Sequence, residues 1–419
     1  MRIVTLSQWY WPEPEVRAHV LARDLARRGH RVTSITGFPN YPHGRIYPGY
    51  RQRPVSVEQL DGVRLVRLPL FPSRSRSAVG RTLNYGSFAA STALLGPFVS
   101  GPADVLWVYH PPITITLGAR SISAARRVPF VLEIQDLWPD TLAATGMVRQ
   151  PWLLKAVGAL ALASYRAAAA IVVISPGFKR ALIARGVPEG KIEVLPNWAD
   201  EDIYAPAQRD VALVAELGIE GKFTVVFAGN MGPAQDLGNL LEAAERLLDV
   251  PSIVFLLVGD GVDLPALRRD AERRRLTNVR FLERRPASAM PNLFSVADAL
   301  LVHLRRDPLF EITIPSKTVA YLACGRPVIS VSAGDAAKVV TDAGAGIVCN
   351  PGRPDELAAA VRNLYAMPTQ ARETMGRAAR SSYEANFTRA IIFARYEDLL
   401  RRVAHRHRFR EDGLESRPS

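Results

Sequence analysis

The stretch that decides the fold is Ile314-Pro-Ser-Lys-Thr-Val-Ala-Tyr-Leu-Ala-Cys-Gly-Arg326. We expect a helix here, because Pro315 suits a first helical turn, where its missing N–H removes no hydrogen bond, and Ser316 can cap that turn. Gly325 is expected to end the helix, and the β-branched run after it is typical of a buried strand. The free N–H groups of a helix start, together with Lys317, favour a bound phosphate. An ordinary helix-to-strand unit with a charged first turn is the alternative interpretation.

The N-terminus shows the same alternation of strand and helix. Ile3-Val-Thr-Leu6 is typical of a buried strand, and an amphipathic helix is expected between Trp9-Tyr-Trp-Pro-Glu13 and Arg28-Gly29-His30. Residues 31–36 predict a second strand, and the turn-forming residues of Gly37-Phe-Pro-Asn-Tyr-Pro-His-Gly44 predict a loop.

Short β-branched runs alternate with amphipathic segments along the whole chain, which predicts parallel sheets covered by helices on both faces. With 419 residues, 48% of them apolar, the chain is long enough for two such cores. We therefore predict an α/β fold of two successive doubly wound, Rossmann-like domains. The predicted parts are an N-terminal domain over 1–196, a C-terminal domain over 197–390, a helix over 391–404 that returns to the first domain, and a charged, disordered tail over 405–419. The further strands that we expect cover 104–109, 129–134, 170–174, 192–195, 223–227, 253–258, 279–282, 299–302 and 328–331.

Taken in order, these motifs resemble family 4 glycosyltransferases, in the subgroup of bacterial enzymes that add amino sugars to surface polysaccharides. The resemblance rests on Pro315-Ser316-Lys317, on the N-terminal motifs and on Glu133-Ile-Gln-Asp136-Leu-Trp-Pro-Asp140. It implies the GT-B architecture, in which an acceptor-binding domain and a nucleotide-sugar domain face each other across a cleft. It also implies a retaining transfer of an N-acetylated hexosamine or deoxyhexosamine from a UDP-sugar to a hydroxyl acceptor. That acceptor would be a lipid-linked saccharide or another small molecule.

Glycines follow several strands of the second predicted domain, where they let the backbone approach a ligand closely. Many strand-to-helix turns carry two glycines without binding anything, so the glycines alone leave the function open. The resemblance implies that Lys317 and nearby helix starts neutralise the departing diphosphate. The donor-binding residues that we expect are Gly229, Asn230, Met231, Gly232, Gly259, Gly261, Arg284, Arg285, Glu311, Ile314, Pro315 and Ser316.

The sequence departs from the family pattern at three places, two near Lys317 and one after the first predicted strand. Ala320 occupies the position of a ribose-binding glutamate, and Ile312, next to Glu311, occupies that of a second glutamate eight residues earlier. Without a carboxylate at position 320, the ribose loses charge-assisted hydrogen bonds that contribute about 1.5–3 kcal/mol. The glycine-rich loop that many relatives have after the first strand is replaced by Pro12-Glu-Pro-Glu-Val16, in which Glu13 and Glu15 fit surface charges.

The first predicted domain carries the candidates for acceptor binding. His110 follows a buried strand, where a histidine is typical of a polar cap, and the resemblance favours an active-site role instead. Asp136 closes the next strand and is expected to face the cleft, where it would orient the acceptor or His110. The acceptor-binding residues that we expect are Trp9, Asn40, Tyr41 and His43.

The charge of the chain favours an anionic partner. The formal net charge is +13, and only six of the 53 basic residues are lysines. A diphosphate or a membrane surface fits this charge, whereas the absence of zinc-finger, helix-turn-helix and basic-aromatic patterns argues against nucleic acid. Two cysteines outside any metal or redox motif fit a reducing cytoplasm, and no secretory signal is recognisable before the strand at Ile3. We expect a cytoplasmic protein at the membrane face.

The sequence predicts no metal site and no cofactor beyond the UDP-sugar co-substrate. The one Asp-x-Asp motif, Asp200 and Asp202, falls in the expected interdomain segment instead of after a sheet strand, and histidines and carboxylates do not cluster.

One uncharged segment has three interpretations. Residues 82–103 carry no charge and follow Arg74, Arg76 and Arg81. The segment fits a transmembrane span by length, a buried helix of the first domain, or a helix lying in the inner leaflet beside anionic lipids. Pro97 is expected to break the end of any such helix.

Two other functions stay open. One is a natural-product glycosyltransferase with a soluble acceptor. The other is a non-catalytic sugar-nucleotide-binding or scaffold subunit, which Ala320 and the missing glycine loop suggest.

Overall fold

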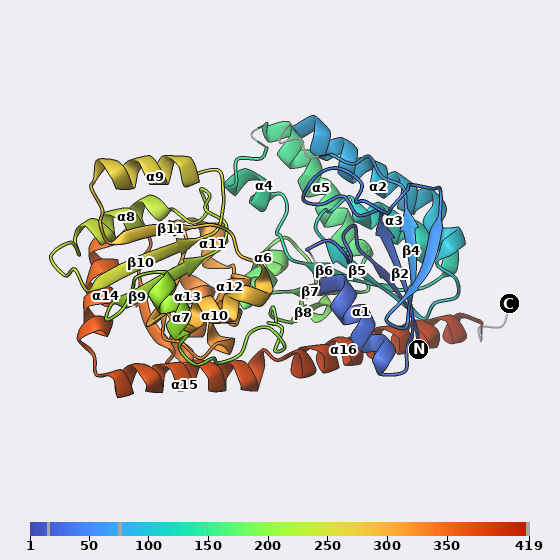
Figure 1. The fold of residues 1–419 in the computed structure, drawn as a ribbon. Coiled ribbons are helices and arrows are strands. Elements are labelled where there is room, and N and C mark those ends of the chain that lie inside the picture. Colours follow the sequence, from blue (N-terminus) through green and yellow to red (C-terminus); the bar gives the residue numbers. More distant parts are fainter. Residues whose placement is uncertain (15–16, 74–77, 149, 416–419) are drawn as a thin grey trace. The chain divides into compact units, whose positions relative to one another are not determined.

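The computed structural model describes all residues except 15–16, 74–77, 149 and 416–419 (Figure 1). The chain divides into two compact units, and each is described by itself. The first unit comprises Met1–Ile174, Phe178–Leu195 and the C-terminal segment from Phe393, and the second comprises Ser175–Gly177 and Pro196–Ile392. Arg74, Arg76 and Glu15, which the sequence singled out, lie outside the described residues.

The first unit is built on an eight-stranded sheet. Its strands are β1 (Arg2–Leu6), β2 (Arg31–Gly37), β3 (Ser56–Leu60), β4 (Val63–Leu68), β5 (Val105–His110), β6 (Phe130–Ile134), β7 (Ala170–Val173) and β8 (Ile192–Val194). They lie in the order β3-β4-β2-β1-β5-β6-β7-β8, and β3 is antiparallel to β4 while the other pairs are parallel. The strand order reverses between β1 and β5, because β2 to β4 lie on one side of this pair and β6 to β8 on the other. Doubly wound sheets bind ligands in the crevice beside the carboxyl ends of two such strands.

Helices cover this sheet. They are α1 (Arg17–Arg27), α2 (Ala78–Val99), α3 (Ile115–Arg126), α4 (Asp140–Ala144), α5 (Pro151–Ala167), α6 (Pro176–Ala184), the short 3₁₀ helix η1 (Glu189–Lys191) and α16 (Arg389–Glu415).

The uncharged segment forms α2, which packs closely on α3. A Cβ atom at Gly118 would lie 2.2 Å from the Thr92 hydroxyl oxygen, so only glycine permits this approach. Pro97 does not break the helix as expected, because α2 continues to Val99. Proline has no N–H group, so Pro97 cannot donate to the Ala93 carbonyl one turn earlier. That carbonyl instead accepts a hydrogen bond of 2.6 Å from the Ser121 hydroxyl of α3. None of the described helices combines the length and the apolar character that a membrane crossing requires.

The last helix, α16, is longer than predicted. A disordered tail was expected from residue 405, but the helix runs to Glu415. Ion pairs hold it to the first unit: Arg402 lies 2.7 Å from Glu193, and Arg408 lies 2.7 Å from Asp104. These anchors supply tertiary stabilisation that a charge-rich helix end lacks by itself.

The second unit is built on a six-stranded parallel sheet. Its strands are β9 (Phe223–Ala228), β10 (Ile253–Val258), β11 (Val279–Leu282), β12 (Ala299–His303), β13 (Val328–Val331) and β14 (Gly346–Cys349). Its helices are α7 (Val211–Glu216), α8 (Leu237–Glu245), α9 (Leu264–Arg273), η2 (Ala287–Ala289), α10 (Met290–Ser295), α11 (Pro308–Glu311), α12 (Ser316–Ala323), α13 (Gly334–Asp342), α14 (Pro354–Ala366) and α15 (Thr369–Asn386). The order β11-β10-β9-β12-β13-β14 places the switch point between β9 and β12.

Alternation along β9 shows how this sheet divides its core. Val225 and Phe227 pack with α8, α9 and α14 on one face, whereas Val226 and Ala228 pack with α10, α12 and α15 on the other. A strand buried on both faces shows a continuous apolar run, which is why β9 could be predicted from its sequence.

The sequence missed the hairpin of β3 and β4 and the short edge strand β14. A hairpin signal was present, because Asp61 and Gly62 join the two strands with φ angles of 50° and 79°, as a tight primed turn requires. The start of α12 was also misjudged. Pro315 precedes the helix, Ser316 is its first residue, and no side chain caps it.

Candidate functional site

Two glycine loops interlock at the carboxyl edge of the second sheet. They follow β9 and β10, and Gly229 and Gly259 have φ angles of 142° and 140°, which favour glycine. A Cβ atom at Gly259 would lie 2.0 Å from the Gly229 carbonyl oxygen, and one at Gly261 would lie 2.1 Å from that of Met231. The loops therefore pack backbone against backbone, and the N–H groups of Gly229, Met231 and Gly259 donate to carbonyl oxygens within this edge of the sheet at 2.9, 2.8 and 3.2 Å.

Lys317 extends from the first turn of α12 to these loops. Its Nζ atom is shielded from solvent, although the residue as a whole is partly exposed, and it has no hydrogen-bond partner. It lies 4.0 Å from the centre of the Phe227 ring, and a Cβ atom at Gly229 would be 2.8 Å from it. Burial lowers the pKa of Lys317 to about 7. A shielded ammonium without a counter-ion is destabilising, so an anion in this place would gain its full attraction.

His303, which the sequence analysis did not select, ends β12 beside the same loop. Its Nδ1 lies 2.6 Å from the Gln235 carbonyl oxygen and donates to it, while its Nε2 has no partner. Burial lowers the pKa of His303 to about 4, and the Lys317 charge acts in the same direction. The ring is therefore neutral at pH 7, with Nε2 free to accept a hydrogen bond from a hydroxyl group. His303 could have been predicted from the sequence, because it is a polar residue directly after the predicted strand 299–302.

The other expected donor residues have varied environments. Asn230 is exposed, whereas Met231 and Gly232 are buried beneath the loop. Arg284 and Glu311 are exposed, and Arg285 lies 3.5 Å from Glu216. Ile314 is buried, Pro315 is partly exposed and Ser316 is exposed ahead of Lys317.

At the switch point of the first sheet, His110 ends β5. It is fully buried, neither ring nitrogen has a partner, and it packs edge-on against Trp138 at 5.6 Å between ring centres. Burial lowers the pKa of His110 to about 3. Asp136 therefore does not hydrogen-bond to His110, and the other alternative, that Asp136 orients the acceptor, stays a prediction. At such a pKa the imidazole is neutral and a weak base, which suits it to accept a hydrogen bond more than to remove a proton.

Aromatic rings gather at the end of β1. The ring centre of Trp9 lies 5.6 Å from that of Tyr41 and 6.3 Å from that of Tyr85. The Asp136 carboxylate is close enough to Tyr85 to add to the rise in the pKa of that phenol, which burial mainly causes. The structure thus brings Trp9 and Tyr41 together beside Tyr85, with the Asp136 carboxylate near that phenol, and acceptor binding by these residues stays a prediction.

Asn40 lies under this cluster, in a chain of buried amides. The Asn84 amide donates to the Asn40 side-chain oxygen at 3.3 Å, and the Gln8 amide donates to the Asn84 oxygen at 2.7 Å. His43 lies apart from it: it is exposed and contacts Tyr47, with ring centres 5.9 Å apart. Asn40 therefore positions the loop, and His43 is not joined to the cluster.

Glu13 is no surface charge. It is 1% exposed, and its carboxylate accepts hydrogen bonds from the backbone N–H groups of Tyr10, Asn40 and Tyr41 at 3.1, 2.8 and 2.7 Å. Burial raises the pKa of Glu13 while these bonds oppose the rise. This residue ties the loop after β1 to the loop after β2, and so fixes Trp9 and Tyr41.

The Asp-x-Asp motif has a structural role. Asp200, Glu201 and Asp202 surround the Arg389 guanidinium, with ion pairs of 3.0, 2.6 and 2.8 Å. Within the described ranges, no group of three or more histidine, cysteine or acidic residues is arranged to hold a metal ion.

Comparisons with known proteins show the family to which the chain belongs. Family models described as "Glycosyl transferase 4-like domain" and "Glycosyl transferases group 1" match residues 13–198 and 222–367. The chain belongs to the family 4 glycosyltransferases. A putative colanic acid biosynthesis glycosyl transferase, WcaI of Escherichia coli, is 30% identical over 364 residues, which cover 83% of this chain and 88% of that protein. The probable glycosyltransferase WbjE of Pseudomonas aeruginosa is 21% identical over 65% of this chain and 68% of its own length.

Solved structures agree on the fold of this glycosyltransferase. The Anabaena protein HepE, whose crystal structure contains UDP, has a TM-score of 0.71 at 19% identity, covering 96% of this chain and 99% of that one. A trehalose 6-phosphate synthase from Burkholderia multivorans has a TM-score of 0.74 at 15% identity, covering 100% and 98%. The predicted GT-B fold, with two Rossmann-like domains, is confirmed.

Proposed function

We propose that the protein transfers a sugar from a UDP-sugar to a hydroxyl acceptor in the synthesis of a surface polysaccharide. The observation that carries this proposal is Lys317, a shielded ammonium with no counter-ion, set against two glycine loops. A diphosphate supplies the missing negative charge, and the first-turn N–H groups of α12 supply hydrogen bonds. The relative WcaI, which is named for colanic acid biosynthesis, supports the pathway, and the UDP in HepE supports the nucleotide.

The reaction that we propose is retaining and metal-independent. The bond between the anomeric carbon and the donor phosphate breaks as the acceptor hydroxyl attacks on the same face, and the departing phosphate takes the hydroxyl proton. Lys317 neutralises the diphosphate, which removes the need for a cation from solution. His110, neutral and a weak base, orients the acceptor hydroxyl. The motif resemblance favours an N-acetylated hexosamine or deoxyhexosamine as the sugar.

Donor turnover is tested by measuring nucleotide release from UDP-N-acetylglucosamine, UDP-N-acetylgalactosamine, UDP-glucose and GDP-mannose. A lipid extract of bacterial membranes serves as the acceptor. We expect release from a UDP-sugar, faster with the extract than without it. UDP binding without any turnover would instead identify a non-catalytic subunit, and absence of UDP binding would refute the donor site.

We also propose that the acceptor is lipid-linked, because one face of α2 is apolar and exposed. Leu83, Leu94 and Phe98 are 49%, 70% and 81% exposed. Leu94 follows Leu83 by about three helical turns and Phe98 follows Leu94 by about one, so all three lie on one side of the helix. A helix with such a stripe, uncharged after Arg81 near its start, fits the surface of an anionic bilayer.

Sedimentation with phosphatidylglycerol vesicles tests this surface. Phe98→Glu should weaken binding, and so should added salt, because the attraction of the basic residues is screened over about 10 Å at 0.1 M. Val211→Glu, at a position that is 76% exposed in the second unit, is the matched control. A protein that stays in the supernatant at low salt would favour a soluble acceptor, as in natural-product glycosyltransferases.

A further inference from the structure

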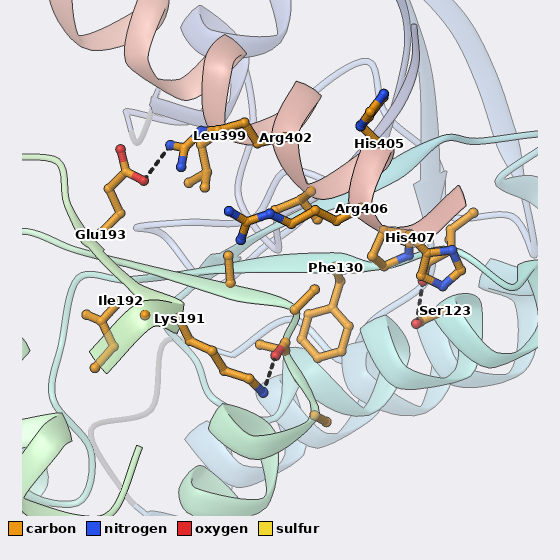
Figure 2. Close-up of a pocket in the computed structure, with 18 of the residues that line it drawn as sticks. Ser123, Phe130, Lys191, Ile192, Glu193, Leu399, Arg402, His405, Arg406 and His407 are labelled. Carbon is orange, nitrogen blue, oxygen red and sulfur yellow. Dashed lines mark hydrogen bonds and ion pairs between the residues drawn. The ribbon is translucent and has the colours of Figure 1, made fainter. Parts of the chain in front are cut away.

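A cavity lies in the first unit, at the edge of the sheet opposite to His110. It has a volume of about 660 Å³ and lies between the last turns of α16 and the strands that begin at Phe130, Ala170 and Ile192 (Figure 2). In a parallel sheet these strand starts lie at the edge opposite to the carboxyl ends. The cavity is therefore separate from the acceptor residues, and its volume is in the range of small-molecule sites, about 300–1,000 Å³.

Part of its wall is apolar. Leu399 and Val403 come from α16, and Val128, Phe130 and small alanine side chains come from the sheet side. Val128, Phe130 and Val403 are buried, so the wall is a continuation of the core. A ring or a short alkyl group fits such a surface.

Positive charge lines the same cavity. Lys191, Arg402 and Arg406 face a single carboxylate, Glu193, which pairs with Arg402 at 2.7 Å. Lys191 donates to the carbonyl oxygens of Arg166 and Ala168, both at 2.9 Å. Figure 2 shows the Arg406 side chain extending from α16 into the space that the drawn residues surround. Among the described residues, no hydrogen bond or ion pair engages Arg406.

We propose that this cavity binds a small organic phosphate whose phosphate group pairs with Arg406 and Lys191 and whose apolar part packs on the apolar part of the lining, where the Phe409 ring is 64% exposed. Arginine matches the planar, bidentate geometry of a phosphate, and two cations against one already paired carboxylate leave an excess of positive charge. A ligand here joins the last turns of α16 to the first unit, at a site distinct from that of the transfer reaction.

Phenyl phosphate is the probe, added to the full chain with saturating UDP so that the site around Lys317 is occupied. Hydrogen exchange of the backbone amides in 189–193 and 399–409 should slow with phenyl phosphate, whereas phenol should leave it unchanged. Arg406→Gln should raise the dissociation constant about tenfold or more, as expected for a charge-assisted hydrogen bond. Gly190→Leu should abolish the protection, because a Cβ atom there meets open space and the larger side chain would fill the cavity.

Two matched variants control for general effects. Arg401→Gln removes an arginine of α16 that pairs with Glu397 outside the cavity, and Gly238→Leu adds the same side chain at an unobstructed glycine of α8. Both should bind phenyl phosphate as the parent does and should fold equally well. Unchanged exchange in both segments, or equal loss of protection in Arg401→Gln and Arg406→Gln, would overturn the proposal. Equal binding of inorganic phosphate and phenyl phosphate would also overturn it, because the apolar wall would then have no role.

Discussion

The two sheets offer ligands two different surfaces at equivalent places. In the second unit, the loops after β9 and β10 consist mainly of glycine backbone and lie beside the shielded Lys317 amine. In the first unit, the corresponding loops present the rings of Trp9 and Tyr41, and the neutral His110 lies buried at the end of β5. A polyanion needs N–H groups and charge, whereas a sugar or lipid-linked acceptor needs flat apolar faces and hydrogen-bond acceptors. The function that we propose therefore assigns the donor to the second unit and the acceptor to the first.

The largest effect is expected at the charged edge. Lys317→Ala should lower the affinity for UDP by about 1–3 kcal/mol and the transfer rate by about 10²–10³, because the charge that stabilises the leaving diphosphate is lost. Calorimetry with UDP and an assay of UDP release measure the two quantities. Lys338→Ala is the matched control, since that lysine is exposed and pairs with Asp342 at 2.9 Å. Equal UDP affinity in Lys317→Ala and the parent would refute the donor assignment.

The aromatic edge should respond in the opposite way. His110→Asn should slow transfer by about tenfold to a hundredfold, at or below the lower end of the range for a positioned acid or base, and leave the UDP dissociation constant unchanged. His43→Asn, at an exposed position, should change neither quantity. A loss of UDP affinity in His110→Asn would show that the division of roles between the two edges is wrong.

UDP binding at the charged edge of the second unit should be coupled to proton uptake by Lys317. Because the pKa of Lys317 is about 7 in the free protein, UDP binding above that pH must draw a proton onto the amine. The affinity should fall with rising pH between 7 and 9, by at most about tenfold per unit, and should vary much less in Lys317→Ala. Calorimetry in buffers of different ionisation enthalpy reports the proton directly.

The stability of the free protein should change with pH in the opposite direction. The folded pKa of Lys317 lies below its ordinary value of 10.5, so the unfolded chain binds more protons between about pH 7 and 10.5. This residue therefore makes unfolding less favourable as the pH rises through that window. Thermal melts of the parent and of Lys317→Ala would show whether the difference has this sign.

The smallest effect is expected at the missing ribose carboxylate. Ala320→Glu should tighten UDP binding by about tenfold, as expected for a restored charge-assisted hydrogen bond. It should also lower the melting temperature, because Ala320 is 8% exposed and belongs to the hydrophobic cluster between the sheet and α12. Unchanged or weaker UDP binding would mean that this enzyme holds the ribose in another way.

The sequence predicted most of the fold because its strands are buried on both faces. Continuous apolar runs such as Phe223–Phe227 mark such strands, whereas the half-exposed β3 and the short β14 lack that pattern. Lys317 and the glycines were found through their position at strand and helix ends. Glu13 and the His303 ring could not be evaluated in the same way, because their roles depend on burial and on partners far along the chain. The end of α16 was missed because distant ion pairs hold it.

The interlocked glycines have a consequence for engineering the donor preference. Any side chain at Gly259 or Gly261 would enter the backbone of the neighbouring loop, so neither position can be varied without pushing β9 and β10 apart. A library aimed at a new sugar nucleotide should therefore leave both glycines unchanged. Diversity belongs at Asn230, Arg284 and Glu311, which are exposed and tolerate new side chains without displacing the main chain.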